Sequence, residues 1–109
     1  MGSQGSTTVN FGTFPGGTDT TVAVTGQAGI AGGSLVEVWV PAVATADHSA
    51  DEHWLDPPYV TAGNIQAGTG FTIYAKAPDV WSGYSTVQPT PPDATNRMYG
   101  QYTVFWVWN

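Results

Sequence analysis

The chain has 109 residues, no cysteine, two basic and eight acidic side chains, and a formal net charge of −6. A chain of this length forms one domain with its own core, so we expect a single domain over 1–109. Two cations cannot neutralise a phosphate backbone or hold an anionic membrane surface. The composition therefore argues against nucleic-acid and membrane partners, and it excludes disulfides, thiolate metal sites and thiol nucleophiles.

The chain begins with a polar stretch, MGSQGS, that lacks the basic and apolar regions of a secretory signal. No apolar run approaches the roughly 20 residues that cross a bilayer. We therefore expect a protein made and used without Sec export. Residues 1–6 are predicted to form a flexible arm.

Short β-branched and aromatic runs, separated by Gly and Pro signals, predict an all-β domain of seven to eight short strands. Such a pattern is typical of a two-sheet antiparallel sandwich, either jelly-roll or immunoglobulin-like. The expected strands cover residues 6–11, 20–25, 34–40, 59–65, 70–77 and 101–109, with an ambiguous segment at 53–55. Alternation places Val36 and Val38 on one face with Glu37 and Trp39 on the other.

The last strand carries large side chains on both faces: Tyr102, Val104, Trp106 and Trp108 on one, and Thr103, Phe105 and Val107 on the other. A strand with one wet face should instead alternate apolar and polar residues. The sequence leaves two interpretations open. Either this is a central core strand, or another molecule covers part of its aromatic surface.

Residues 78–98 contain four of the eight prolines and no strand pattern. Loops of this length are usually functional or disordered. The aromatic side chains of Trp81 and Tyr84 favour a loop that packs against another surface. We predict an extended contact loop, and the alternative is an insertion folded over its own sheet.

Both histidines and four of the eight carboxylates lie within residues 46–56. Imidazole and carboxylate groups are ligands for divalent cations, which makes His48, Asp51, Glu52 and His53 a candidate metal site. Their spacing matches no established metal motif. The competing prediction is a loop in which Asp residues cap a turn or a short helix and a histidine bonds to the backbone.

Catalytic signals are missing from the chain: there is no nucleophile elbow, phosphate loop or cysteine nucleophile. The expectation is a non-enzymatic protein without a cofactor or catalytic residues. Sugar binding is a further alternative, because exposed aromatic rings on a β-domain form stacking surfaces. The candidates are Trp39, Trp54, Trp81, Trp106 and Trp108, against the interpretation that Trp106 or Trp108 belongs to the core.

Five stretches resemble a group of small proteins of tailed bacteriophages and prophages, usually encoded near virion structural genes. They are STTVNFG at 6–12, VAVTGQAGI at 22–30, TADHSADEH at 45–53, AGNIQAGTGFTIY at 62–74 and YGQYTVFWVWN at 99–109. The resemblance implies a virion component made in the bacterial host cytoplasm, and it transfers no catalytic residues.

Together, the resemblance and the low charge favour a capsid decoration, or cement, protein that stabilises the head. Its partners would be capsid or other virion proteins and copies of itself, with a trimer favoured. The predicted interface residues are Trp81, Tyr84, Tyr102, Trp106 and Trp108. The alternatives are a receptor- or glycan-binding module of a head or tail fibre, and a free-standing carbohydrate-binding domain.

Overall fold

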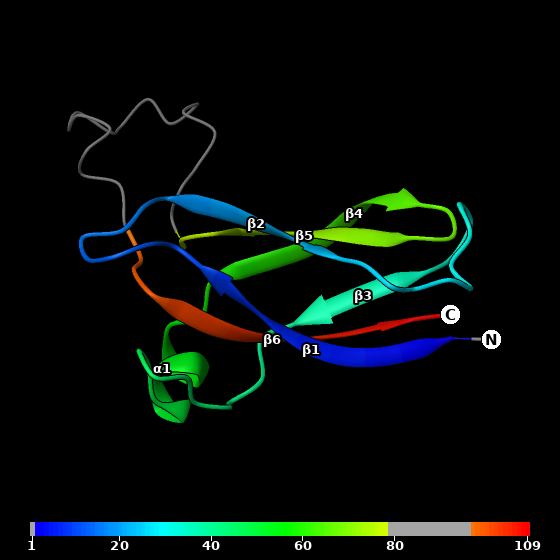
Figure 1. Cartoon of the computed structure of the whole chain (residues 1–109). Helices are drawn as coiled ribbons and strands as arrows, with labels where there is room; N and C mark the ends of the chain where they lie inside the picture. The colour runs from blue at the N-terminus through cyan, green and yellow to red at the C-terminus, as the bar shows by residue number, and fades with distance from the viewer. Residues whose placement is uncertain (1, 79–96) are drawn as a thin grey trace, which may run out of the picture.

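The computed structural model describes residues 2–78 and 97–109. Within them the protein is mostly β, with six strands in two three-stranded antiparallel sheets and one short helix. The elements are β1 (Ser3–Asn10), β2 (Asp19–Val24), β3 (Val36–Trp39), α1 (Ala50–Leu55), β4 (Tyr59–Gln66), β5 (Gly70–Lys76) and β6 (Gln101–Trp108). We call the β1-β6-β3 sheet the lower sheet and the β2-β5-β4 sheet the upper sheet, after their places in Figure 1.

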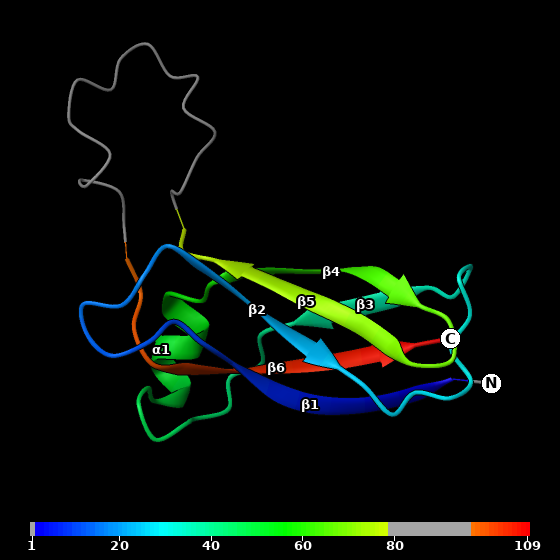
Figure 2. The same ribbon diagram turned by 45° about the horizontal axis from the view of Figure 1, so that its top comes forward.

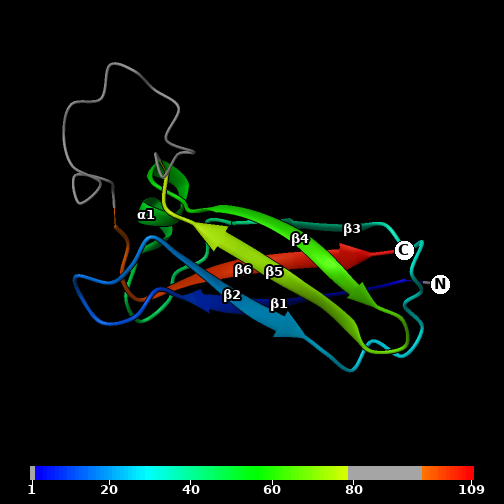
Figure 3. The same ribbon diagram turned by 90° about the horizontal axis from the view of Figure 1, so that it is seen from above.

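Among the described residues, the chain passes between the two sheets except at β4 and β5, which form a hairpin of consecutive strands. Their turn is closed by a hydrogen bond from the Thr69 N–H to the Gln66 carbonyl, 2.9 Å long, and Gly68 has a φ of 76°. A positive φ at the third turn position suits glycine. Seen from above, the strands of the upper sheet cross those of the lower sheet at an angle (Figure 3).

The core lies between the sheets. Phe71 of β5 meets Trp106 of β6 edge to face, with ring centroids 5.6 Å apart, so these two rings join the central strands. The indole N–H of Trp108 donates to Gln27 Oε1 at 2.9 Å, which satisfies its polar group inside the protein. The buried apolar residues are Val9, Phe11, Val24, Ile30, Phe71, Ile73, Ala75, Ala77, Met98, Tyr102, Val104, Trp106 and Trp108.

The strand predictions at 6–11, 20–25, 34–40, 59–65, 70–77 and 101–109 each correspond to an observed strand, with ends shifted by a few residues. The ambiguous segment at 53–55 is instead part of α1, so the described residues hold six strands rather than seven or eight. Ser49 begins this helix with a capping box, in which its hydroxyl accepts from the Glu52 N–H and the Glu52 carboxylate accepts from the Ser49 N–H.

The N-terminus differs from the expected flexible arm. Ser3–Ser6 belong to β1, which pairs with β6 from Ser3–Trp108 to Asn10–Gln101, so the two ends of the chain lie side by side (Figure 1). Gly, Ser and Gln have low strand propensity. Backbone pairing with a long, buried central strand supplies the order that these residues do not supply themselves.

Of the predicted contact loop at 78–98, residues 79–96 lie outside the described part of the chain. Near its end, Met98 is buried and forms a bridge with Gly17. The Met98 carbonyl also lies where a Cβ on Gly16 would be, so only glycine fits at Gly16.

Candidate functional site

The segment with both histidines packs against the beginning of β6. Figures 1 and 2 show α1 beside the beginning of β6, at the end of the molecule away from the two chain termini. His53 is 1% exposed, its Nδ1 donates to the Ser49 carbonyl at 2.8 Å, and its Nε2 accepts from the Thr103 N–H at 3.0 Å. These two partners require the neutral ring with its proton on Nδ1.

His48 is also buried, and both of its ring nitrogens face acceptors. Nε2 donates to the Tyr99 carbonyl, and Nδ1 lies 3.2 Å from Glu52 Oε2. The ring stacks on Tyr102 with centroids 4.1 Å apart. Because a carbonyl and a carboxylate both accept, His48 satisfies both partners only when both of its nitrogens carry protons.

Two more side chains of this segment bond to the backbone of β6. Thr45 Oγ1 donates to the Gln101 carbonyl at 2.7 Å, and the Gln101 N–H donates to Asp47 Oδ2 at 2.8 Å. The Thr103 N–H also donates to His53. Together these three hydrogen bonds cover the part of β6 that β3 does not reach, because β3 pairs only with Phe105–Trp108. The histidine segment therefore takes the place of a strand along this edge.

This arrangement bears on the predicted metal site. Within residues 2–78 and 97–109, no three His, Cys, Asp or Glu side chains are placed to hold a metal ion. His48 and His53 use both ring nitrogens within the protein, and Asp51 is exposed on α1. The predicted bond between a histidine and a backbone carbonyl is present in both His48 and His53. The N-cap of α1, however, is Ser49 rather than an aspartate.

Two pKa shifts belong to the same cluster. The Ser49 backbone N–H, and then the His48 ring, hold the pKa of the Glu52 carboxyl below its usual value. Burial raises the pKa of Tyr102 to about 12, and the negative charges of Asp56 and Glu52 add to the effect. Both shifts follow from structural contacts and require no ligand.

Three of the predicted interface residues lie in the core of the single chain. Tyr102, Trp106 and Trp108 are 4%, 7% and 5% exposed and point between the sheets from the central strand β6. Their apolar surface is therefore already covered by the chain itself, which agrees with the central-strand interpretation. Trp81 and Tyr84 lie outside the described residues.

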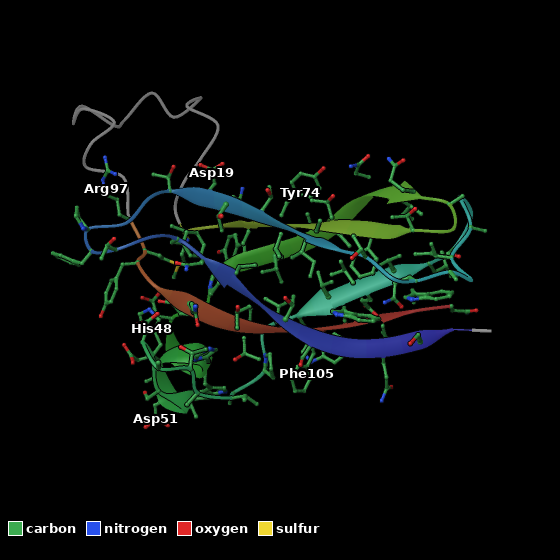
Figure 4. The ribbon with its side chains drawn as sticks, in the orientation of Figure 1. Asp19, His48, Asp51, Tyr74, Arg97 and Phe105 are labelled. Atoms are coloured by element: carbon green, nitrogen blue, oxygen red, sulfur yellow. The ribbon has the colours of Figure 1, made fainter. Side chains whose placement is uncertain are left out.

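The outer face of the lower sheet is apolar and uncovered. Trp39 is 44% exposed and meets Phe105 edge to face at 6.0 Å between centroids. Beside them is a hollow of about 380 Å³ whose wall includes Gln4 and Ser6. Trp54 of α1 and Leu35, which precedes β3, are also more than 70% exposed. Figure 4 shows Phe105 pointing away from the core on this side.

The outer face of the upper sheet is different. Figure 4 shows Tyr74 and Asp19 on the side opposite Phe105. Tyr59 and Tyr74 are 58% and 42% exposed and line a hollow of about 360 Å³ together with Thr61 and Lys76. Tyr59 and Phe105 are not among the interface or sugar-binding residues that the sequence predicted. Strand alternation alone was the available signal for them.

No protein-family model matches this chain, and no curated protein or solved structure matches it significantly. In the described residues, no helix is long and apolar enough to span a membrane.

Proposed function

We propose that this protein is a non-enzymatic structural protein of a bacteriophage virion, and that it decorates the capsid by binding through the outer face of the lower sheet. The observation that carries the proposal is an aromatic pair on the outer face of the lower sheet, formed by Trp39, which is 44% exposed, and the half-buried Phe105. The virion context comes from the resemblance described above.

Exposed apolar groups that gather on one face are typical of a surface that binds another protein. Trp39 and Phe105 are paired across β3 and β6, with Val107 two residues further along β6, and Trp54 and Leu55 of α1 are further exposed apolar side chains. Aromatic anchors of this kind supply most of the energy in many interfaces. A capsid surface with complementary apolar pockets is the partner that this face fits.

The low charge of the chain supports the same proposal. With ten charged residues in 109, little charged surface has to be desolvated when the protein packs against a large assembly. Contacts between copies of the chain would also desolvate few charged groups, so we propose a closed homo-oligomer on the particle, with a trimer favoured. The finer fold proposal is a jelly-roll or immunoglobulin-like sandwich.

The test uses virions of the phage or prophage that encodes the chain. Quantitative mass spectrometry should find the protein in purified heads at a copy number that is a multiple of the capsomer number. Recombinant protein should bind heads that lack it, and the double variant Trp39→Ser, Phe105→Ser should lose binding while keeping its fold by circular dichroism.

The matched control is Tyr74→Ser, which changes an exposed aromatic residue of similar size on the opposite face and should bind heads normally. Absence of the protein from purified virions would overturn the virion role. Undiminished binding by the Trp39, Phe105 double variant would instead overturn the assignment of the binding face.

A further inference from the structure

The hollow on the upper sheet has a surface chemistry unlike that of the lower sheet. Its wall joins two exposed tyrosine rings, Tyr59 and Tyr74, to the hydroxyls of Thr21 and Thr61. These side chains form cross-strand rows: Thr21 and Thr61 flank Tyr74, while Asp19 and Tyr59 flank Lys76. The face is therefore a regular array of rings and hydrogen-bonding groups.

The ring of Tyr74 leans along the sheet toward the neighbouring strand. A Cβ added to Gly63 of β4 would lie 3.3 Å from Tyr74 Cε1, so glycine leaves the room that the ring occupies. The ring remains 42% exposed in this position. The Tyr59 ring is held near the Lys76 ammonium, whose Nζ lies 6.0 Å from the ring centroid.

The hollow carries one charge of each sign, because Asp19 and Lys76 are directly paired across β2 and β5. A strongly charged ligand gains little from such a pair. An apolar ligand would offer no hydrogen bonds to the hydroxyls of Thr21 and Thr61. The ligand that fits has an apolar C–H face for the rings and hydroxyls at its rim.

From this chemistry we propose that the upper sheet binds a neutral saccharide, stacked on Tyr59 and Tyr74 and hydrogen-bonded by Thr21, Thr61, Asp19 and Lys76. The hollow of about 360 Å³ lies within the usual size range of small-molecule sites. It is open and shallow, which suits a segment of a polysaccharide rather than an enclosed monosaccharide.

This site is independent of the proposed attachment face. The two hollows lie on the outer surfaces of opposite sheets, so a protein bound through Trp39 and Phe105 would leave Tyr59 and Tyr74 facing solvent (Figure 4). Substitutions at one face should not affect binding at the other. The failure of one proposal can therefore be told apart from the failure of the other.

The experiment titrates the full chain with neutral hexasaccharides of glucose, mannose and N-acetylglucosamine in several linkages, followed by two-dimensional NMR of the backbone amides. At least one sugar should shift the amides of β2, β4 and β5 around Thr21, Thr61 and Tyr74 at millimolar concentration. Tyr59→Ser and Tyr74→Ser should each weaken binding about tenfold, the typical value of a lost aromatic contact.

Tyr59→Phe and Tyr74→Phe keep the rings and should retain most of the affinity, which separates stacking from a general loss of structure. Trp39→Ser on the lower sheet is the matched control and should bind normally. Three outcomes would overturn the proposal: no shifts with any sugar of the panel, shifts confined to the lower sheet, or unchanged binding by the Tyr59→Ser, Tyr74→Ser double variant.

Discussion

The two sheets differ in what pairs with their central strand. In the upper sheet, β5 is paired along its length by β2 on one side and β4 on the other. In the lower sheet, β1 covers all of β6, but β3 covers only Phe105–Trp108, and side chains from residues 45–53 bond to the rest. The lower sheet thus depends on particular side chains where the upper sheet depends on backbone pairing.

The sheets also differ on their outer faces. The lower sheet presents Trp39 and the half-buried Phe105 beside Gln4 and Ser6, whereas the upper sheet exposes Tyr59 and Tyr74 among threonines and an Asp–Lys pair. We propose protein contact for the first surface and a hydroxyl-rich ligand for the second. This difference is the basis of the two proposals.

The largest effect should come from the core residue that joins the two sheets. Trp106→Ala removes a buried indole packed on Phe71 and should lower the free energy of unfolding by about 3–5 kcal/mol. Trp39→Ala, on the outer face of the same sheet, should cost no more than about 1 kcal/mol. Urea denaturation of the two variants measures the contrast, and equal losses would show that the core and surface assignments are wrong.

The next largest loss of stability should come from substitutions at the edge of β6 that side chains of residues 45–53 bond to. His53→Phe keeps a buried ring but leaves the Thr103 N–H without its partner, at a cost of about 1–3 kcal/mol, while the Ser49 carbonyl keeps its bond from the His53 backbone N–H. Hydrogen exchange should then become faster at Thr103 before it does in β5. Unchanged exchange at Thr103 would contradict the role assigned to this histidine.

Two glycines on edge strands should respond differently to alanine. A Cβ at Gly5 of β1 would lie 2.5 Å from Cζ2 of the buried Trp106 ring, so Gly5→Ala should destabilise the protein by about 1–3 kcal/mol. Gly63→Ala on β4 meets only the exposed Tyr74 ring at 3.3 Å and should be nearly neutral. Thermal melts of both variants provide the test, and the reverse order would contradict the packing described.

The pKa shifts predict the pH dependence of the lower-sheet cluster. Since Tyr102 has a pKa of about 12 in the folded protein against 10.0 as its ordinary value, it favours folding below pH 10, and this contribution is lost as pH rises through that interval. For Glu52 the pKa is lowered, so its contribution is present above about 4.5 and is lost as pH falls below that value. Tyr102→Phe should reduce the alkaline loss of stability, which denaturation curves from neutral to alkaline pH would detect.

The smallest expected effect concerns metal ions. Because both ring nitrogens of His48 and His53 already have protein partners, adding Zn²⁺ or Ca²⁺ should leave the melting temperature unchanged. A rise that a chelator reverses would restore the metal-site prediction for His48, Asp51, Glu52 and His53.

The sequence by itself determined where the six strands lie, to within a few residues at their ends, and how side chains alternate along them. Val36 and Val38 pack inward while Trp39 points out, and Ile73 is buried beside an exposed Tyr74, as alternation predicts. This information is local, because successive side chains in a strand point in opposite directions whatever the strand packs against.

Only the tertiary structure decided which of those faces is covered. Trp106 and Trp39 are the same residue type on paired strands of one sheet, yet the upper sheet covers the first and leaves the second exposed. The two histidines likewise form hydrogen bonds with the backbone of Tyr99 and Thr103, about fifty residues away in the chain. Such contacts depend on how distant segments are brought together, and neither residue type nor local spacing encodes that arrangement.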